Sequence, residues 1–223
     1  MTDYLISRSE HFVPDTSVTV LKGTAALDIL DRTVSTKITG MKSLDMQQAL
    51  FCDSNGRVDD IATVYLLDKQ ILMLSSKEFG EATRKKLAAG IGWDEDCKLL
   101  NGDAAISRIS VICRDPVEVM SLLGLENEHL FPGKALECGD ILISTTEYGS
   151  CAGVEILVPK GTLPSIREKL SVFGSKSASE ERWDFLRIRL GVPSIHDARG
   201  NLPSEVGMGR LVSLDKGCYP GQE

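Results

Sequence analysis

The segment Met46–Leu67, MQQALFCDSNGRVDDIATVYLL, contains the pattern that decides the fold class. Its two apolar runs, Met46–Cys52 and Val58–Leu67, are typical of β-strands, and Asn55-Gly56 lies in the short connection between them. Asn and Gly both tolerate a positive φ angle, which tight hairpin turns require. The segment therefore predicts an antiparallel β-hairpin, and Gln70–Ser75 predicts a third strand of the same sheet.

Helix-like segments alternate with strands on both sides of this hairpin. A strand is expected at Ser17–Leu21, and from Gly23 onward apolar residues recur at helical spacing. The other expected elements are strands at Ala104–Cys113, Ile141–Thr145 and Val154–Val158, and helices over Glu78–Ala89, from Asp115-Pro116, over Leu163–Phe173 and over Glu180–Leu190. Antiparallel sheets with helices packed on them define an α+β fold.

The length and the even composition favour a single domain. A chain of 223 residues buries enough surface to fold without disulfides or metals, and no composition break marks a linker. We therefore expect one domain over residues 1–223. The small polar stretch Ser175–Ser179 (SKSAS) predicts a hinge between two lobes of that domain.

Charge and apolar content exclude several classes of partner. The chain has 25 Lys and Arg residues against 32 Asp and Glu, a formal net charge of −7, which repels phosphates at long range. We therefore expect no direct binding to nucleic acid or to an anionic membrane.

No apolar run approaches the roughly 20 residues of a spanning helix, and the N-terminus lacks the pattern of a signal peptide. Six cysteines without Cys-x-x-Cys spacing predict reduced thiols in the cytoplasm and no metal site.

The last eight residues, Lys216–Glu223 (KGCYPGQE), form the stretch most suggestive of chemistry. Gly217 and Gly221 permit close approach of the backbone to a ligand or to another segment. Lys216 stands two residues before Cys218, where its charge would favour the thiolate. From the residues alone, the alternative is a C-terminal tail with an inert cysteine.

This run resembles the K-G-C-Y-x-G-Q-E signature of the YgfZ-type folate-binding proteins, which are relatives of the glycine-cleavage T-protein, an aminomethyltransferase. Further segments are similar to this superfamily: Val20–Ala25, Asn55–Asp60, Gly153–Ile156, Leu186–Ile188 and Gly191–Pro193. The resemblance implies a T-protein-like fold with a central cavity for tetrahydrofolate. Relatives usually continue into a small C-terminal β-barrel beyond the position of Glu223, so either the barrel is absent in this protein or the sequence is a fragment of a longer chain.

The resemblance implies roles for two carboxylates. Glu155 would hold the pterin, since one carboxylate can accept hydrogen bonds from the adjacent N–H and amino groups of the pterin edge. Asp60 would lie near the reactive nitrogens of the folate and support one-carbon transfer by electrostatics and proton handling. Without the resemblance, Glu155 and Asp60 are both interpreted as solvated residues of a strand. Neighbouring residues of a strand point to opposite faces, so we expect Asp59 to face solvent if Asp60 faces the cavity.

Other site residues follow from the same matches. Tyr148 stands seven residues before Glu155, as in the T-proteins, and Arg187 matches an arginine of the family. Trp183 stands where T-proteins have an arginine, so it either stacks on a ring of the folate or packs in the core. Within the signature, Cys218 would be the functional thiol, and the residues expected to support and position it are Lys216, Gly217, Tyr219, Gly221, Gln222 and Glu223.

Three hypotheses about function stay open at this point. The first is a tetrahydrofolate-binding protein of the YgfZ type, whose folate site serves iron–sulfur cluster assembly or repair, and through it tRNA modification, with iron–sulfur protein partners. The second is a true enzyme, an aminomethyltransferase of the glycine cleavage system, which takes a methylene group from a lipoyl-carrier protein to tetrahydrofolate. The third is a degenerate scaffold that binds a partner protein and no folate.

Overall fold

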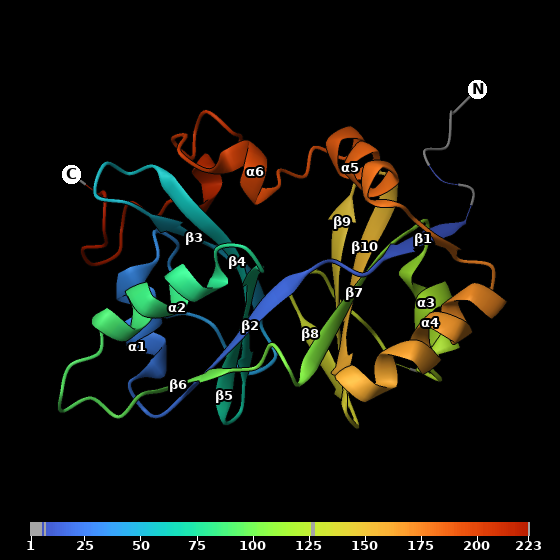
Figure 1. The fold of residues 1–223 in the computed structure, drawn as a ribbon, viewed down its shortest axis with the longest axis horizontal. Coiled ribbons are helices and arrows are strands. Elements are labelled where there is room, and N and C mark those ends of the chain that lie inside the picture. The colour runs from blue at the N-terminus through green and yellow to red at the C-terminus, as the bar shows by residue number, and fades with distance from the viewer. Residues whose placement is uncertain (1–5, 7, 126–127, 223) are drawn as a thin grey trace. The chain divides into compact units, whose positions relative to one another are not determined.

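The structure is a computed structural model that describes residues 6, 8–125 and 128–222 (Figure 1). The chain forms two compact units, each made of two separate stretches. Unit 1 consists of Met1–Pro14 and Ala104–Val192, and unit 2 consists of Asp15–Asp103 and Pro193–Glu223. The polar stretch Ser175–Ser179 falls inside unit 1, and the hinge expected there stays a prediction.

The sheet of unit 2 has five strands among the described residues, in the order β3-β4-β5-β2-β6, and its neighbouring strands are antiparallel. The strands are β2 (Thr16–Lys22), β3 (Met46–Cys52), β4 (Val58–Leu67), β5 (Gln70–Ser76) and β6 (Lys98–Asn101). The hairpin predicted from Met46–Leu67 is confirmed, since β3 pairs with β4 and Gly56 in its turn has a φ of +73°.

Two helices complete the core of unit 2. Figure 1 shows α1 (Ala26–Thr33) and α2 (Gly80–Ala89) beside each other next to the sheet. Helix α1 buries Ala26, Ile29 and Leu30 on one side, which is the helical spacing that the sequence shows. Ala26 and Leu30 belong to one core cluster with Phe51, Val64, Met73 and Leu87, and these four have no exposed surface. The short helix α6 (Ile195–Ala198) and the 3-10 turn η2 (Gly209–Leu211) follow in the last stretch of the unit.

The sheet of unit 1 has six strands in the described part of the chain, in the order β11-β1-β7-β10-β9-β8. They are β1 (Ser9–Phe12), β7 (Ile106–Cys113), β8 (Ala135–Cys138), β9 (Ile141–Tyr148), β10 (Cys151–Pro159) and β11 (Lys176–Ser177). All pairs are antiparallel except β1 with β11, which is parallel. The predicted hairpin between the segments around Ile141 and Val154 is confirmed as β9 and β10.

Helices cover both faces of this sheet. Helices α3 (Pro116–Leu122) and α4 (Leu163–Val172) contribute Val119 and Ile166 to a core with Val154 and Ile156 of β10. Helix α5 (Glu180–Arg189) packs on the other face, where Leu186 meets Ile112. A 3-10 turn, η1 (Lys160–Thr162), joins β10 to α4. The α+β class predicted from the sequence is thus confirmed, and none of the described helices is long and apolar enough to cross a membrane.

A buried histidine makes the stability of unit 1 depend on pH. His11 of β1 is 1% exposed, its Nδ1 atom lies 3.0 Å from Ser175 Oγ, and its Nε2 atom has no partner among the described residues. Burial lowers the pKa of His11 below its ordinary value of 6.5, and the charge of Arg167 lowers it further. The folded state therefore binds a proton less readily than the unfolded state, so acid below about pH 6.5 destabilises the fold.

The variant His11→Asn keeps an amide donor near Ser175 and cannot titrate. We expect its free energy of unfolding to approach that of the native chain as the pH falls from 7.5 to 5, measured by urea denaturation at each pH. Parallel curves for the two proteins across this range would contradict the assignment.

Candidate functional site

The carboxylate of Glu155 is held in place by two donors from the neighbouring strand of unit 1. Its Oε2 atom accepts hydrogen bonds from Arg108 Nε at 2.6 Å and from Ser110 Oγ at 2.7 Å. Ser110 of β7 is the register partner of Glu155 on β10, so the strand pairing itself brings these groups together. The Glu155 side chain is 21% exposed and that of Arg108 is 25% exposed. Both contacts are made to Oε2, and neither uses Oε1.

An aromatic ring lies on the same face of the sheet as this carboxylate. Successive side chains of a strand point to opposite faces, so Gly153 and Glu155 share the face opposite Val154. The Tyr148 ring packs on Gly153, because a Cβ atom at that position would lie only 2.6 Å from Tyr148 Cε2. Glycine is therefore required at position 153 for the ring to lie there. Tyr148 and Glu155 thus place an aromatic ring and an acceptor on one face of the sheet, a combination suited to an aromatic heterocycle that carries N–H donors.

Helix α5 places the two other predicted residues of unit 1. The Trp183 ring stacks on Phe12 with centroids 5.5 Å apart and planes 19° apart. Arg187 Nε donates to Asp184 Oδ1 at 2.6 Å, and a terminal nitrogen of Arg187 lies 3.5 Å from the Val192 carbonyl. Both side chains thus have partners within unit 1, and contact of either with a folate stays a prediction.

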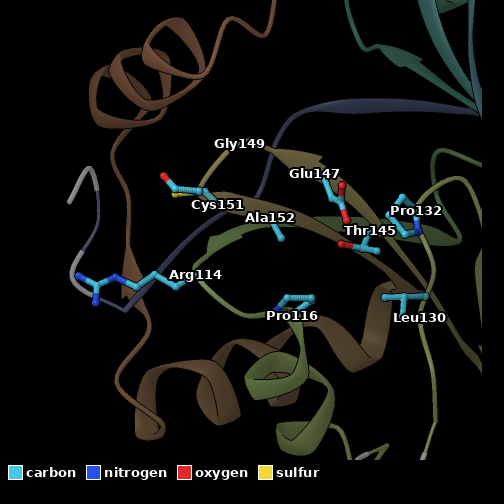
Figure 2. A pocket seen from close by; sticks show the side chains of 10 residues that line it. Arg114, Pro116, Leu130, Pro132, Thr145, Glu147, Gly149, Cys151 and Ala152 are labelled. Atoms are coloured by element: carbon cyan, nitrogen blue, oxygen red, sulfur yellow. The ribbon is translucent and has the colours of Figure 1, made fainter. Parts of the chain in front are cut away.

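A separate cavity of about 230 Å³ opens in unit 1, on the face of the sheet opposite Glu155 (Figure 2). Its lining includes Ala152 and Glu147, which pair across β10 and β9 and share the face of Val154. In Figure 2 the Arg114 side chain extends away from the other lining residues, and its guanidinium donates to the Ile6 carbonyl. None of the site residues expected from the sequence lines this cavity, so we do not place the site there.

In unit 2, Asp60 is buried under helix α2. The side chain is 1% exposed, Thr83 Oγ1 donates to its Oδ2 atom at 2.5 Å, and the Ile61 amide donates to Oδ1 at 2.9 Å. Burial raises the pKa of Asp60 to about 6, although these hydrogen bonds lower it in part. The buried Ser75 hydroxyl also lowers the pKa of Asp60 in part, although its Oγ atom does not meet the geometric criteria for a hydrogen bond. A carboxyl group with such a pKa is suited to proton transfer near neutral pH.

The neighbouring carboxylate has a different environment. Asp59 is 40% exposed and its Oδ2 atom lies 2.9 Å from Lys86 Nζ. Both aspartates therefore contact helix α2, but Asp59 is partly solvated and Asp60 is buried.

The C-terminal signature lies against two other segments of unit 2. Lys216 binds backbone carbonyls at the end of α1, and Gly221 contacts the turn between β3 and β4. Cys218 between them is exposed, and Tyr219 donates its hydroxyl to the Ser213 carbonyl at 3.2 Å. The expected effect of Lys216 on the thiol stays a prediction, and so do the roles of Gly217 and Gln222, whereas Glu223 lies outside the described residues.

Three side chains that bind the two candidate carboxylates, Arg108, Ser110 and Thr83, were not predicted from the sequence. Arg108 and Ser110 alternate with the apolar Ile109 and Val111, so the strand pattern already places both on the polar face of β7. Their pairing with Glu155 depends on the register between β7 and β10, which no local pattern reports. Thr83 carries no signal in the sequence. Among the described residues, no group of three or more His, Cys, Asp or Glu side chains could hold a metal ion.

No family model and no curated protein matches this sequence. The fold is similar to that of the glycine cleavage system aminomethyltransferase T from Bartonella henselae, with a TM-score of 0.83 and 16% sequence identity. The match covers 96% of this chain and 61% of that chain, so the chain spans less than two thirds of the aminomethyltransferase. A heterotetrameric sarcosine oxidase from Corynebacterium sp. U-96 matches with a TM-score of 0.51 and 13% identity, over 77% of this chain and 88% of that chain. These likenesses confirm the predicted T-protein-like fold.

Proposed function

We propose that this chain binds tetrahydrofolate through the Glu155 face of unit 1. The observation that carries the proposal is the pair of Glu155 and Tyr148 on one sheet face, with the carboxylate held by Arg108 and Ser110. The T-protein-like fold supports it, because an aminomethyltransferase has the same arrangement of elements.

The geometry explains how the site would select a pterin. A carboxylate has about four acceptor positions, and Arg108 and Ser110 use two of them on Oε2. Oε1 is left to accept hydrogen bonds from a ligand, and a carboxylate binds adjacent N–H and amino donors strongly. Because Arg108 and Ser110 fix the side chain before the ligand arrives, less conformational entropy is lost on binding. The Tyr148 ring supplies the apolar contact that a flat heterocycle requires.

Within this class, we assign the chain to the YgfZ type, with a role in iron–sulfur cluster assembly or repair and, through it, in tRNA modification. The support is the run Lys216–Glu223, together with the exposure of its thiol at Cys218. In this function Cys218 is the reactive group, and the folate site serves it. Partners would be iron–sulfur proteins, and the chain acts in the cytoplasm.

An anaerobic calorimetric titration with tetrahydrofolate tests the pterin site. The native chain is expected to bind saturably, and Glu155→Ala is expected to lower the affinity about a hundredfold, since two hydrogen bonds to a charged group are lost. Glu147→Ala is the matched control, because it removes an exposed glutamate from the opposite face of the same sheet. Equal affinities of the native chain and Glu155→Ala would contradict the assignment, and no binding to the native chain would favour the scaffold hypothesis.

The thiol is tested separately from the pterin site. Cys218→Ala is expected to leave the affinity for tetrahydrofolate unchanged and to abolish the protein's support of an iron–sulfur enzyme in cells that depend on this chain. Cys138→Ala is the control, because Cys138 is also exposed and lies in unit 1. Full activity of Cys218→Ala would remove the YgfZ assignment while leaving folate binding intact.

The buried carboxyl group of Asp60 favours a second candidate, the aminomethyltransferase. A pKa of about 6 suits a group that handles a proton during methylene transfer to tetrahydrofolate. In a glycine-cleavage assay with a lipoyl-carrier protein, Asp60→Asn is then expected to abolish turnover and Cys218→Ala to have little effect. No turnover by the native chain in this assay would count against the aminomethyltransferase.

A further inference from the structure

The C-terminal strap, which we define as residues 211–222, lies along residues 31–37, which form the end of α1 and the start of its connection to β3. Thr36 Oγ1 donates to the Leu211 carbonyl at 2.6 Å, and the Ser213 amide donates to the Ser35 carbonyl at 2.9 Å. Further along, Lys37 Nζ lies 3.0 Å from Asp215 Oδ2, an ion pair with both side chains largely exposed. The strap is therefore attached to one segment of unit 2 over several residues.

Lys216 makes the most deeply buried contact of the strap. Its side chain is 1% exposed, and its Nζ atom donates to the Asp31 carbonyl, to the Val34 carbonyl at 2.8 Å and to the Thr36 carbonyl at 3.1 Å. The carboxylate of Asp31 lies 3.4 Å away. The end of a helix leaves carbonyl groups unpaired and carries a partial negative charge, so a compact cation with three donors is well matched to it.

Gly221 makes the second contact, on the turn between β3 and β4. Its φ is +79°, and a Cβ atom there would lie 2.3 Å from the Asp53 carbonyl oxygen and 2.4 Å from the Gly56 nitrogen. The carbonyl oxygen of Gly221 lies against Gly56 in turn, since a Cβ atom at Gly56 would be 2.9 Å from it. Only glycine fits at position 221 while the strap stays on this turn. The other glycine of the signature, Gly217, has no such restriction, because a Cβ atom there would have no neighbour within 4 Å.

We propose that Lys216 and Gly221 are positioning residues, which fix the two ends of the loop at residues 217–220 and so hold Cys218 at one exposed place on unit 2. The inference rests on the proposed function, because Cys218 is the thiol that this function uses. It differs from the expectation drawn from the spacing of Lys216 and Cys218. The ammonium group donates hydrogen bonds to the carbonyls of Asp31, Val34 and Thr36. Lys216 therefore affects the thiol by fixing the backbone that carries Cys218.

Hydrogen exchange measured by mass spectrometry tests this inference on the full chain without any ligand. Lys216→Met and Gly221→Ala are expected to speed exchange in the peptide covering residues 211–222 by about tenfold or more, because each detaches one end of the loop. Lys37→Met and Gly217→Ala are the matched controls, a lysine on the same strap with an exposed ion pair and a glycine with open space. Both are expected to exchange like the native chain.

The rate of hydrogen exchange in the rest of unit 2 shows whether a variant detaches only the strap or destabilises the whole unit. A peptide from β4 is expected to keep its protection in both variants, whereas a purely structural role would speed exchange in β4 and the strap together. Should Lys216→Met fail to fold, the comparison of Gly221→Ala with Gly217→Ala decides alone. Exchange of Gly221→Ala at the rate of Gly217→Ala would overturn the proposal.

The alkylation rate of Cys218 against pH distinguishes positioning from a direct charge effect. Measured on the Cys218 peptide, the pH at which the rate rises is expected to be the same in the native chain, in Lys216→Met and in Lys216→Arg. A shift to higher pH in Lys216→Met, restored in Lys216→Arg, would show that Lys216 acts on the thiol by its charge and would refute the proposal. Neither measurement involves folate, so its outcome is independent of the pterin site.

Discussion

Asp60→Asn is expected to stabilise the protein at pH 8 by up to about 3 kcal/mol relative to the native chain. The pKa of Asp60 is raised from 3.8 to about 6, mainly by burial, and each tenfold change in proton affinity corresponds to about 1.4 kcal/mol. A carboxyl group with a raised pKa stabilises the fold fully below its unfolded value and loses that contribution as the pH rises through about 6. Above pH 6 the fold carries a buried charge, which the neutral amide removes.

The difference is measured by urea denaturation of both proteins at pH 4 and pH 8. It is expected to be large at pH 8 and small at pH 4, where Asp60 is protonated in the fold. Asp59→Asn is the control, because it breaks only the partly exposed pair with Lys86 and should change the stability by less than about 1 kcal/mol. A stability difference between Asp60→Asn and the native chain that is the same at pH 4 and pH 8 would refute the raised pKa. If Asp60→Asn is more stable than the native chain but loses turnover, Asp60 contributes to the reaction at a cost in stability.

Gly80→Ala is expected to destabilise the protein by about 3 kcal/mol, an overpacking effect at the start of α2. A Cβ atom at Gly80 would lie 2.1 Å from both Cβ and Oγ of Ser17 on β2. Ser17 has no exposed surface, and its hydroxyl is held between Arg84 and Asp103, so it cannot rotate away without losing those contacts. Helix α2 would have to move off the sheet, and Thr83 with it.

Gly90→Ala is the matched control at the other end of the same helix. Gly90 has a φ of −85°, and a Cβ atom there would be 3.4 Å from its nearest neighbour, so alanine fits. We expect a change within about 0.5 kcal/mol, measured by urea denaturation. Similar losses in the two variants would show that helix α2 does not pack against Ser17 as described.

The elements predicted from the sequence are those whose signal is local. The hairpin over Met46–Leu67 was predicted with the observed bounds of β3 and β4, because an Asn-Gly turn and two apolar runs lie within 22 consecutive residues. The short strands β1 and β11 were missed. Their sequences, SEHF and KS, are polar, and their pairing joins segments more than 160 residues apart, so no window of sequence contains the signal.

In the candidate site, too, the contacts within one short segment were predictable and those between distant segments were not. Tyr148 and Glu155 lie on one hairpin, so their shared face follows from strand alternation within a short segment. The partners of Glu155 come from β7, and their contact depends on a register that tertiary pairing sets. Lys216 is a similar case, since its long side chain reaches carbonyls some 180 residues earlier in the chain, and its spacing from Cys218 gives no sign of these contacts.

The division of each unit between two stretches of chain has a consequence for synthesis. Strand β1 leaves the ribosome long before β7 and β11, its partners in the sheet, so the N-terminal strand has to wait unpaired until more than half of the chain exists. In unit 2 the sheet and its two helices can form from residues 15–103 while the strap is still to be made. The loop around Cys218 then takes its place only on a surface that is already folded. A chain cut before residue 211 would carry the Glu155 face and the hairpin without a placed Cys218.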